Sequence, residues 1–473
     1  MKERGIKVLK GVAFVAMLSA FSGSTARASF TTAEKEYFIS FPADAVLGKE
    51  VRLTAEQLRA LTQKGEQGDL SAQYALGVYY REHAIPKDYQ RAFEWFSRSA
   101  EQGDVKSMSA VGALYSQGLG VTNDFAKAVV WCRKAADLGD MVGEFLLAKM
   151  YSRGDGVEKD TAKSLEWALK AASQGQVDAQ YLAGWIYTHG GADGVTTNYV
   201  EAVKWSRKAA EQGGMLAERM TGLIYARGGH GVSTNFVEAI KWFTKAADQG
   251  DAEAANGLGM IYSVGGPDIA ADSSKAIAWY RKAADLNLAE AQYELGRRYA
   301  RGDGLAKDVG IAISWWRKAA DNGSSDAQAA LALLYEIGEE VKPDAKQAFE
   351  LFQAAAKQGD ASGMAGLARA YYYGSGVEKD YTNAARWNEK AASLGWAEAQ
   401  QLLAAQYANG QGLPRDRKKA LELAQQAADK DSFLAMRLLS WIYSEGGDGV
   451  EIDYAKSAKW LRRAAEHDPT RAR

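Results

Sequence analysis

Residues 361–395 read ASGMAGLARAYYYGSGVEKDYTNAARWNEKAASLG. Small or apolar side chains recur every three or four positions up to Tyr371, as they do on one face of an α-helix. Glycines, starting at Gly374, then break the pattern. A second helical pattern follows Asp380 and contains Trp387 and a closing pair of alanines. The stretch therefore predicts two helices joined by a glycine turn, called here the A helix and the B helix.

The same unit recurs along most of the chain. Its A-helix tyrosine returns at intervals of 35 to 38 residues. The eleven copies are Tyr80, Tyr115, Tyr151, Tyr187, Tyr225, Tyr262, Tyr299, Tyr335, Tyr371, Tyr407 and Tyr443. The B-helix tryptophan is present in nine units and is replaced by Leu351 and Leu423 in the other two. A fixed period of this length is typical of a solenoid built from stacked helix pairs.

Each predicted B helix begins after a side chain that can cap it. Asp or Asn stands at this position in all eleven units: Asp88, Asp124, Asp160, Asn198, Asn235, Asp272, Asp308, Asp344, Asp380, Asp416 and Asp453. Short carboxylates and carboxamides accept hydrogen bonds from the free N–H groups of a first helical turn. We therefore interpret these residues as helix caps rather than as ligand-binding groups.

The composition narrows the class of protein. The chain has 473 residues, is 47% hydrophobic, and has a net charge of −1 from 58 basic and 59 acidic residues. This balance does not favour general nucleic-acid binding, which requires a basic surface. A single cysteine, Cys132, excludes an intrachain disulfide and a cysteine-based zinc cluster. We expect an elongated all-helical protein.

Residues 1–28 have the pattern of a signal peptide. Basic residues such as Lys2 and Arg4 precede an apolar run over residues 11–21, and Ala26 and Ala28 form a small-x-small cleavage site. The apolar run is too short for a permanent membrane span. We expect cleavage near Ala28 and a periplasmic or secreted mature chain without a later transmembrane segment.

The remaining boundaries follow from the repeat. Residues 29–53 are irregular and are predicted to form an extended segment. Residues 54–68 resemble half a unit, with a capping box at Thr54, and are predicted to shield the first full helix pair. Residues 69–468 contain the eleven units, and residues 469–473 form a tail.

The repeat, Ala-Gln-x-x-Leu-Gly-x-x-Tyr, then Gly-x-Gly-Val, then Asp, then Ala-x-x-Trp-x-x-Lys-Ala-Ala, resembles the Sel-one-like repeat (SLR) family, which is related to the tetratricopeptide repeats. The resemblance implies a right-handed superhelix of antiparallel helix pairs with the A helices on the inner surface. It also implies that exported bacterial members are adaptors for envelope or host proteins. One cysteine-rich branch is linked to penicillin binding, but this chain lacks the paired cysteines of that branch.

A search for catalytic chemistry finds no strong motif. The four histidines, His83, His189, His230 and His467, form no i, i+4 pair that would favour a metal site. No Ser-x-x-Lys or Gly-x-Ser-x-Gly motif is present. We therefore expect a non-enzymatic protein without a metal or a cofactor. The alternative is a cell-wall-associated hydrolase, or a penicillin-binding relative, with a site unlike these motifs.

A binding surface should involve positions that the repeat does not specify. The residues six and two positions before each tyrosine vary freely, share one face of the A helix, and resemble the concave-groove positions of tetratricopeptide repeats. Tyr, Trp and Arg, which often anchor protein interfaces, are frequent there. The candidate partner-binding residues are Tyr74, Phe145, Lys149, Tyr181, Trp185, Arg219, Tyr293, Arg297, Arg369, Arg437 and Trp441.

The sequence thus predicts a groove for a protein or peptide ligand, centred on Phe145, Tyr181, Trp185, Tyr293 and Arg297. The alternative is that these aromatic side chains only fill the layer of A helices. If the groove is correct, replacing Tyr181 and Trp185 with Ala should weaken partner binding and leave the melting temperature nearly unchanged. A weak end-to-end dimer through the last helix pair is a further expectation.

Overall fold

Helices make up most of the computed structural model, which describes residues 53–191, 194–338 and 341–467. Over these residues the chain forms 23 α-helices and one π-helical turn, with no β-strand and three isolated β-bridges in loops. The predicted all-α solenoid is therefore confirmed. The predicted signal peptide and nearly all of the predicted extended segment lie outside the described residues.

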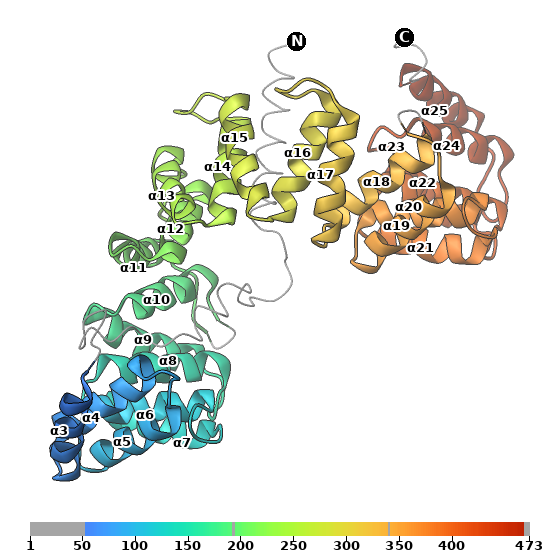
Figure 1. The fold of residues 1–473 in the computed structure, drawn as a ribbon. Coiled ribbons are helices and arrows are strands. Elements are labelled where there is room, and N and C mark those ends of the chain that lie inside the picture. The colour runs from blue at the N-terminus through green and yellow to red at the C-terminus, as the bar shows by residue number, and fades with distance from the viewer. Residues whose placement is uncertain (1–52, 192–193, 339–340, 468–473) are drawn as a thin grey trace. The chain divides into compact units, whose positions relative to one another are not determined.

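The chain divides into two units, residues 1–272 and residues 273–473, which are described separately (Figure 1). The helices of unit 1 are α3 (Ala55–Glu66), α4 (Leu70–Val78), the π-helical η1 (Tyr79–His83), α5 (Tyr89–Glu101), α6 (Val105–Gln117), α7 (Phe125–Asp137), α8 (Met141–Arg153), α9 (Thr161–Ser173), α10 (Val177–His189), α11 (Tyr199–Glu211), α12 (Met215–Arg227), α13 (Phe236–Asp248) and α14 (Ala252–Val264).

Unit 2 continues the alternation of A and B helices. Its helices are α15 (Ser273–Asp285), α16 (Ala289–Arg301), α17 (Val309–Asp321), α18 (Ser325–Ile337), α19 (Ala345–Lys357), α20 (Ala361–Tyr373), α21 (Tyr381–Ser393), α22 (Ala397–Asn409), α23 (Arg417–Ala428), α24 (Phe433–Glu445) and α25 (Tyr454–Glu466). Even-numbered helices from α4 onward are A helices, and odd-numbered helices from α5 onward are B helices.

The B helices begin where their caps predict. In ten units the Asp or Asn side chain accepts a hydrogen bond from the backbone N–H three residues later: Asp88, Asp124, Asp160, Asn198, Asn235, Asp308, Asp344, Asp380, Asp416 and Asp453. In the remaining unit α15 begins at Ser273, directly after Asp272. The capping box at Thr54 is present as well. Helix starts are thus determined locally.

The glycine turn after an A helix has two separate physical causes. Gly374 ends α20 with φ 76°, a left-handed conformation that side chains with a Cβ rarely adopt. Gly376 lies against the backbone of Ala345 at the start of α19, where a Cβ would overlap the carbonyl group. The second glycine therefore lets the loop of one repeat pack onto the B helix of the repeat before it.

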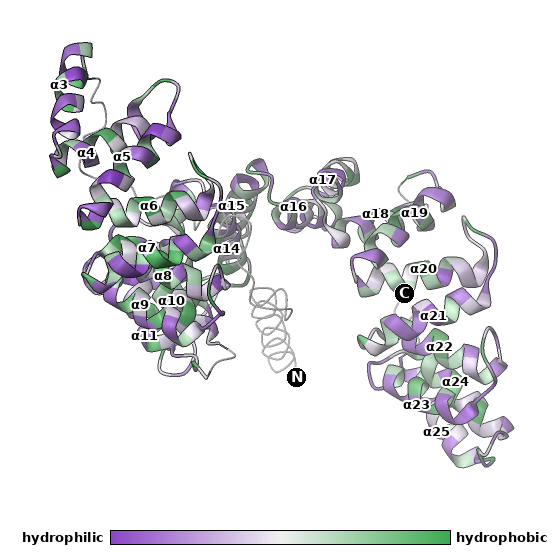
Figure 2. Cartoon of the chain, turned by 90° about the horizontal axis from the view of Figure 1, so that it is seen from below, coloured by the Kyte–Doolittle hydropathy of each residue, from purple (hydrophilic) through white to green (hydrophobic). Residues whose placement is uncertain are grey.

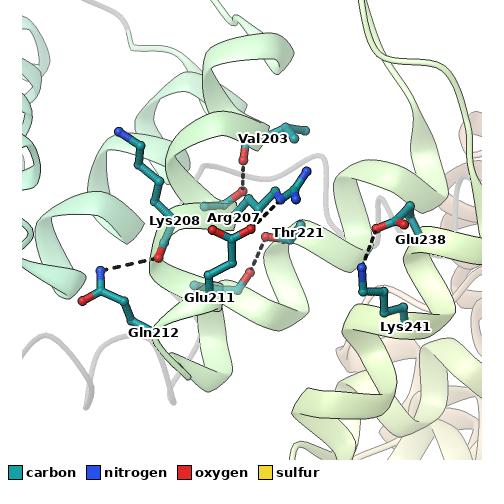
Figure 3. Close-up of polar contacts among 10 residues, drawn as sticks. Val203, Arg207, Lys208, Glu211, Gln212, Thr221, Glu238 and Lys241 are labelled. Carbon is teal, nitrogen blue, oxygen red and sulfur yellow. Dashed lines mark hydrogen bonds and ion pairs between the residues drawn. The ribbon is translucent and has the colours of Figure 1, made fainter.

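The B helices have an apolar face that packs against neighbouring helices and a polar face that is exposed, whereas an A helix such as α10 is buried over most of its length. Hydrophilic and hydrophobic residues accordingly mix along the chain in Figure 2. The closing alanines of the B helix are buried: Ala135 and Ala136 are 0% and 3% exposed. On the polar faces of α11 and α13, Arg207 pairs with Glu211 at 2.8 Å and Lys241 pairs with Glu238 at 3.6 Å (Figure 3). Exposed pairs of this kind add little stability, so packing of the apolar faces holds the repeats together.

Candidate ligand-binding pocket

Three of the predicted binding residues lie in the core of unit 1. Tyr74, Phe145 and Tyr181 are 8%, 2% and 1% exposed. Phe145 and Tyr181 belong to one cluster of buried side chains from several consecutive helices. The prediction that these three side chains are open to a partner is wrong, because they fill the space between neighbouring helices. The alternative, that they form part of the A-helix layer, describes them correctly.

Trp185 lies at the edge of the same cluster and is 9% exposed. Its ring stacks on that of His189, with the ring centroids 4.4 Å apart. This contact leaves little of the indole accessible. Trp185 is therefore a packing residue as well, contrary to the expectation that it anchors a ligand.

The predicted arginine anchors mostly bind acidic groups of the chain itself. Arg219 is buried, and it pairs with Asp251 at 3.2 Å and with Glu253 at 2.8 Å. Because Arg219 lies on α12 and the two acids lie at the start of α14, this contact joins two consecutive A helices. The expectation that Arg219 meets a partner is therefore wrong.

The other predicted residues lie in unit 2. Tyr293 and Arg297 are half-buried on α16, and Arg297 pairs with Glu294 at 2.7 Å. Arg369 pairs with Glu336 and Glu398, again across neighbouring A helices. These residues and the aromatic residues of unit 1 belong to separate units, so the single groove predicted through all of them stays untested.

Two predicted residues near the end of unit 2 are accessible. Arg437 is exposed beside the ring of Phe433, and Trp441 is 38% exposed beneath the guanidinium of Arg417. A partner role for Arg437 and Trp441 stays a prediction.

Lys149, another of the predicted residues, lines a pocket of unit 1. The pocket has a volume of about 370 Å³. Its lining residues come from α6, α7 and α8 and the loops that follow α6 and α8. These three helices pack together and are labelled in Figure 1. Its polar lining consists of Ser116, Gln117, Lys149, Arg153 and Asp155. Its apolar lining consists of Leu119, Phe125, Leu146 and Met150. A mostly apolar hollow with a few convergent polar groups is a common form of binding site.

The electrostatic setting of Lys149 is unusual for a surface lysine. Burial, together with the positive charge of Arg153, lowers the pKa of the Lys149 ammonium to about 8. Lys149 forms no ion pair with any residue that the structure describes. Its ammonium lies 5.5 Å from the centre of the Phe145 ring, which is a favourable cation–π distance. The pocket therefore presents a cation that an anionic group could still neutralise.

The second cation of the pocket is already partly neutralised. Arg153 lies one helical turn after Lys149 and is 4.0 Å from Asp155. The repeat position of Lys149 predicts a binding role for it, whereas Arg153 and the apolar lining residues were not predicted. A useful signal was the pair of basic residues four positions apart at the end of α8. The apolar lining gives no such signal, because it combines residues from two repeats.

The pocket does not resemble a nucleophilic or metal-binding site. Cys132 is buried on α7, and burial raises the pKa of its thiol to about 12. Such a thiol stays protonated and is a poor nucleophile. Among the described residues, no cluster of three or more His, Cys, Asp or Glu side chains could hold a metal ion.

A scaffold of helical repeats, generally non-catalytic and suited to protein–protein interaction, is the class of protein that this fold and pocket define. The model of the Sel1 repeat matches residues 70–104, 105–140, 142–176, 177–214, 216–251, 252–288, 289–324, 325–360, 361–396, 397–432 and 434–469. The chain therefore belongs to the Sel1 repeat family, as its repeat pattern predicts.

Two solved structures support this assignment. The crystal structure of c5321, a protective antigen present in uropathogenic Escherichia coli strains and displaying an SLR fold, has 32% sequence identity and a TM-score of 0.66. That match covers 87% of this chain and 86% of the other. A Sel1 repeat protein from Oxalobacter formigenes has 29% identity and a TM-score of 0.53, covering 68% of this chain and 98% of the other. No curated protein matches the chain.

No helix in the described part of the chain, residues 53–467 apart from two short gaps, combines the length and the apolar character that a membrane span requires.

Proposed function

We propose that this chain is a non-enzymatic, exported adaptor that binds a protein partner through the Lys149 pocket. The observation that carries the proposal is the half-buried ammonium of Lys149, which has no ion-pair partner among the described residues and lies beside an apolar hollow. A buried charge without a partner lowers the stability of a fold, and such features often mark functional sites. The membership of the Sel1 repeat family supports a protein rather than a nucleic acid as the partner.

The export part of the proposal rests on two observations. Residues 1–28 have the basic start, apolar run and Ala-x-Ala site of a signal peptide. The similar Escherichia coli protein is a protective antigen, which supports a location outside the cytoplasm. We expect the chain in the envelope or culture fluid to begin at Ser29, which intact-mass measurement checks. A full-length chain confined to the cytoplasm would contradict export.

Filling the pocket should abolish partner capture. Ser116 lines the pocket at the end of α6, and its hydroxyl donates to the carbonyl of Ala113 at 2.8 Å. In a Ser116→Trp variant the indole would occupy the hollow, whatever the chemistry of the natural ligand. We expect the mature chain, residues 29–473, to retain a partner from envelope extract or host mucosal fluid, and the variant to lose it.

Ser444 provides a matched control for this experiment. It occupies the same repeat position in α24, and its hydroxyl donates to the carbonyl of Trp441 at the same distance, 2.8 Å. A Ser444→Trp variant therefore introduces an equal change far along the sequence from the pocket. Capture should survive in Ser444→Trp. If Ser116→Trp also retains the partner, the pocket is not the binding site.

A further inference from the structure

We infer that the Lys149 pocket binds the carboxyl end of a polypeptide whose last side chain is apolar. This inference rests on the proposed function and adds to it the chemistry of the group that enters the pocket. The lining of the pocket has two adjacent halves, one cationic and one apolar.

The polar half of the lining favours an anion. Lys149 is half-buried, without an ion-pair partner among the described residues, and Arg153 lies on the same face one turn later. Ser116 also lines the pocket, but its hydroxyl donates to the carbonyl of Ala113, so the cations carry the preference for an anion. Asp155 is the acid in the lining, and it is 4.0 Å from Arg153. A carboxylate at Lys149 would form a charge-assisted contact that the chain itself does not provide.

The apolar half of the lining favours a side chain of moderate size. Leu146 and Met150 are 5% and 3% exposed and form the floor beside Lys149 on α8. Phe125, at the start of α7, is 37% exposed, so part of its ring is free to contact a ligand. Burying this apolar surface against an apolar side chain of a ligand would favour binding, although it would not fix the orientation of the ligand.

The adjacency of the two halves distinguishes a chain end from an acidic side chain. An Asp or Glu residue has a carboxylate but little apolar surface of its own. The last residue of a polypeptide carries an α-carboxylate and, when it is Leu, Val or Phe, an apolar side chain on the same Cα. Because the pocket places a lysine directly beside apolar side chains, the terminal residue matches both halves at once.

The charges around Lys149 predict how binding depends on pH. Burial has the largest influence and lowers the pKa of the Lys149 ammonium. Arg153 on α8 lowers it further, whereas the carboxylates of Asp155 in the following loop and Asp178 on α10 raise it. The nearby Cys132 thiol on α7 stays protonated over this range and adds no charge. Lys149 is therefore mostly protonated at pH 7 and loses its charge as the pH rises above about 8. Carboxylate binding should weaken over the same range.

The test uses the mature chain and a fluorescein-labelled octapeptide, Gly-Ser-Gly-Ser-Gly-Ser-Ala-Leu, with a free carboxyl end. Fluorescence polarisation should show binding at pH 7, and the same peptide with an amidated end should bind about tenfold or more weakly, since a hydrogen bond to a charged group is lost. Replacing the last Leu with Gly should also weaken binding. Equal affinity for the free and amidated peptides would overturn the inference.

Variants of Lys149 assign the effect to the pocket. Lys149→Met keeps the length of the side chain and removes its charge, so it should bind the peptide about tenfold or more weakly. Lys170→Met, which changes an exposed lysine of α9, should leave the affinity unchanged. Lys149→Arg should retain binding at about pH 9.5, where the parent chain loses it, because arginine stays charged. Unchanged binding by Lys149→Met would overturn the inference.

Two further outcomes separate this inference from the proposed function. If acetate, which has a carboxylate but no apolar side chain, displaces the peptide at a concentration equal to the dissociation constant of the peptide, the apolar lining contributes nothing and the inference is overturned. If no peptide binds but Ser116→Trp still abolishes partner capture, the carboxyl-end inference fails and the adaptor function stands.

Discussion

Replacing Tyr181 with Ala should lower the free energy of unfolding by about 3–5 kcal/mol, the usual cost of truncating a fully buried aromatic side chain. The Tyr181 ring is 1% exposed on α10, and it packs in one cluster with Phe145, Trp185 and Ile186. Removing it leaves a cavity that helices from adjacent repeats can close only in part. The Tyr181→Ala/Trp185→Ala variant should lose still more stability. A large loss of stability is the opposite of the nearly unchanged melting temperature that the sequence predicts for this double variant.

Urea unfolding of the mature chain, followed by far-UV circular dichroism, checks this prediction. Tyr454→Ala is the matched control, because the Tyr454 side chain is 71% exposed on α25. The control should change stability by no more than about 0.5 kcal/mol. The opposite result would be a Tyr181→Ala/Trp185→Ala variant that unfolds at the same urea concentration as the parent chain but no longer captures the partner. In that case Tyr181 and Trp185 bind the partner, as the sequence predicts, and are not core residues.

Replacing Arg219 with Met should cost about 3–5 kcal/mol, because it leaves a buried carboxylate without its cation. The side chains of Arg219 and Asp251 are 7% and 2% exposed, and their charged groups are 3.2 Å apart. Asp251 also caps α14 by accepting from the backbone N–H of Ala254 at 2.7 Å. The uncompensated charge would therefore lie at the junction of two A helices, and α12 and α14 should separate more easily.

The matched control for this variant is Arg437→Met. Arg437 occupies the same position in its own repeat but is exposed, and its guanidinium lies beside the ring of Phe433. This change should have a small effect on the urea midpoint. Adding Asp251→Asn to Arg219→Met should recover part of the loss, because the buried charge is then removed. A loss below about 1 kcal/mol in Arg219→Met would show that the ion pair is unimportant for stability.

The comparison of Arg219 with Arg437 shows where sequence analysis of the site failed. Both residues lie six positions before the repeat tyrosine, so the repeat pattern predicts the same exposure for both. One is buried against the acids of the following A helix, and the other is open to solvent. The difference arises because α14 follows α12 and places Asp251 and Glu253 opposite Arg219, whereas α24, which carries Arg437, is the last A helix that the structure describes. Lys149 and Phe145 were both predicted to bind a partner because of their positions in the repeat. The same criterion therefore selected a residue that lines a pocket and a residue that is buried in the core.

The local pattern of residues was sufficient to predict the helix pairs, their order and the starts of the B helices, but not the π-helical turn η1 that follows α4. Caps such as Asp124 and left-handed glycines such as Gly374 act on their own backbone, so a single unit contains the information. The exposure of a side chain has a different origin, because an A helix such as α10 packs against the helices that precede and follow it. Whether Tyr181 is core and Lys149 lines a pocket depends on side chains that are distant in sequence and meet only when the repeats stack.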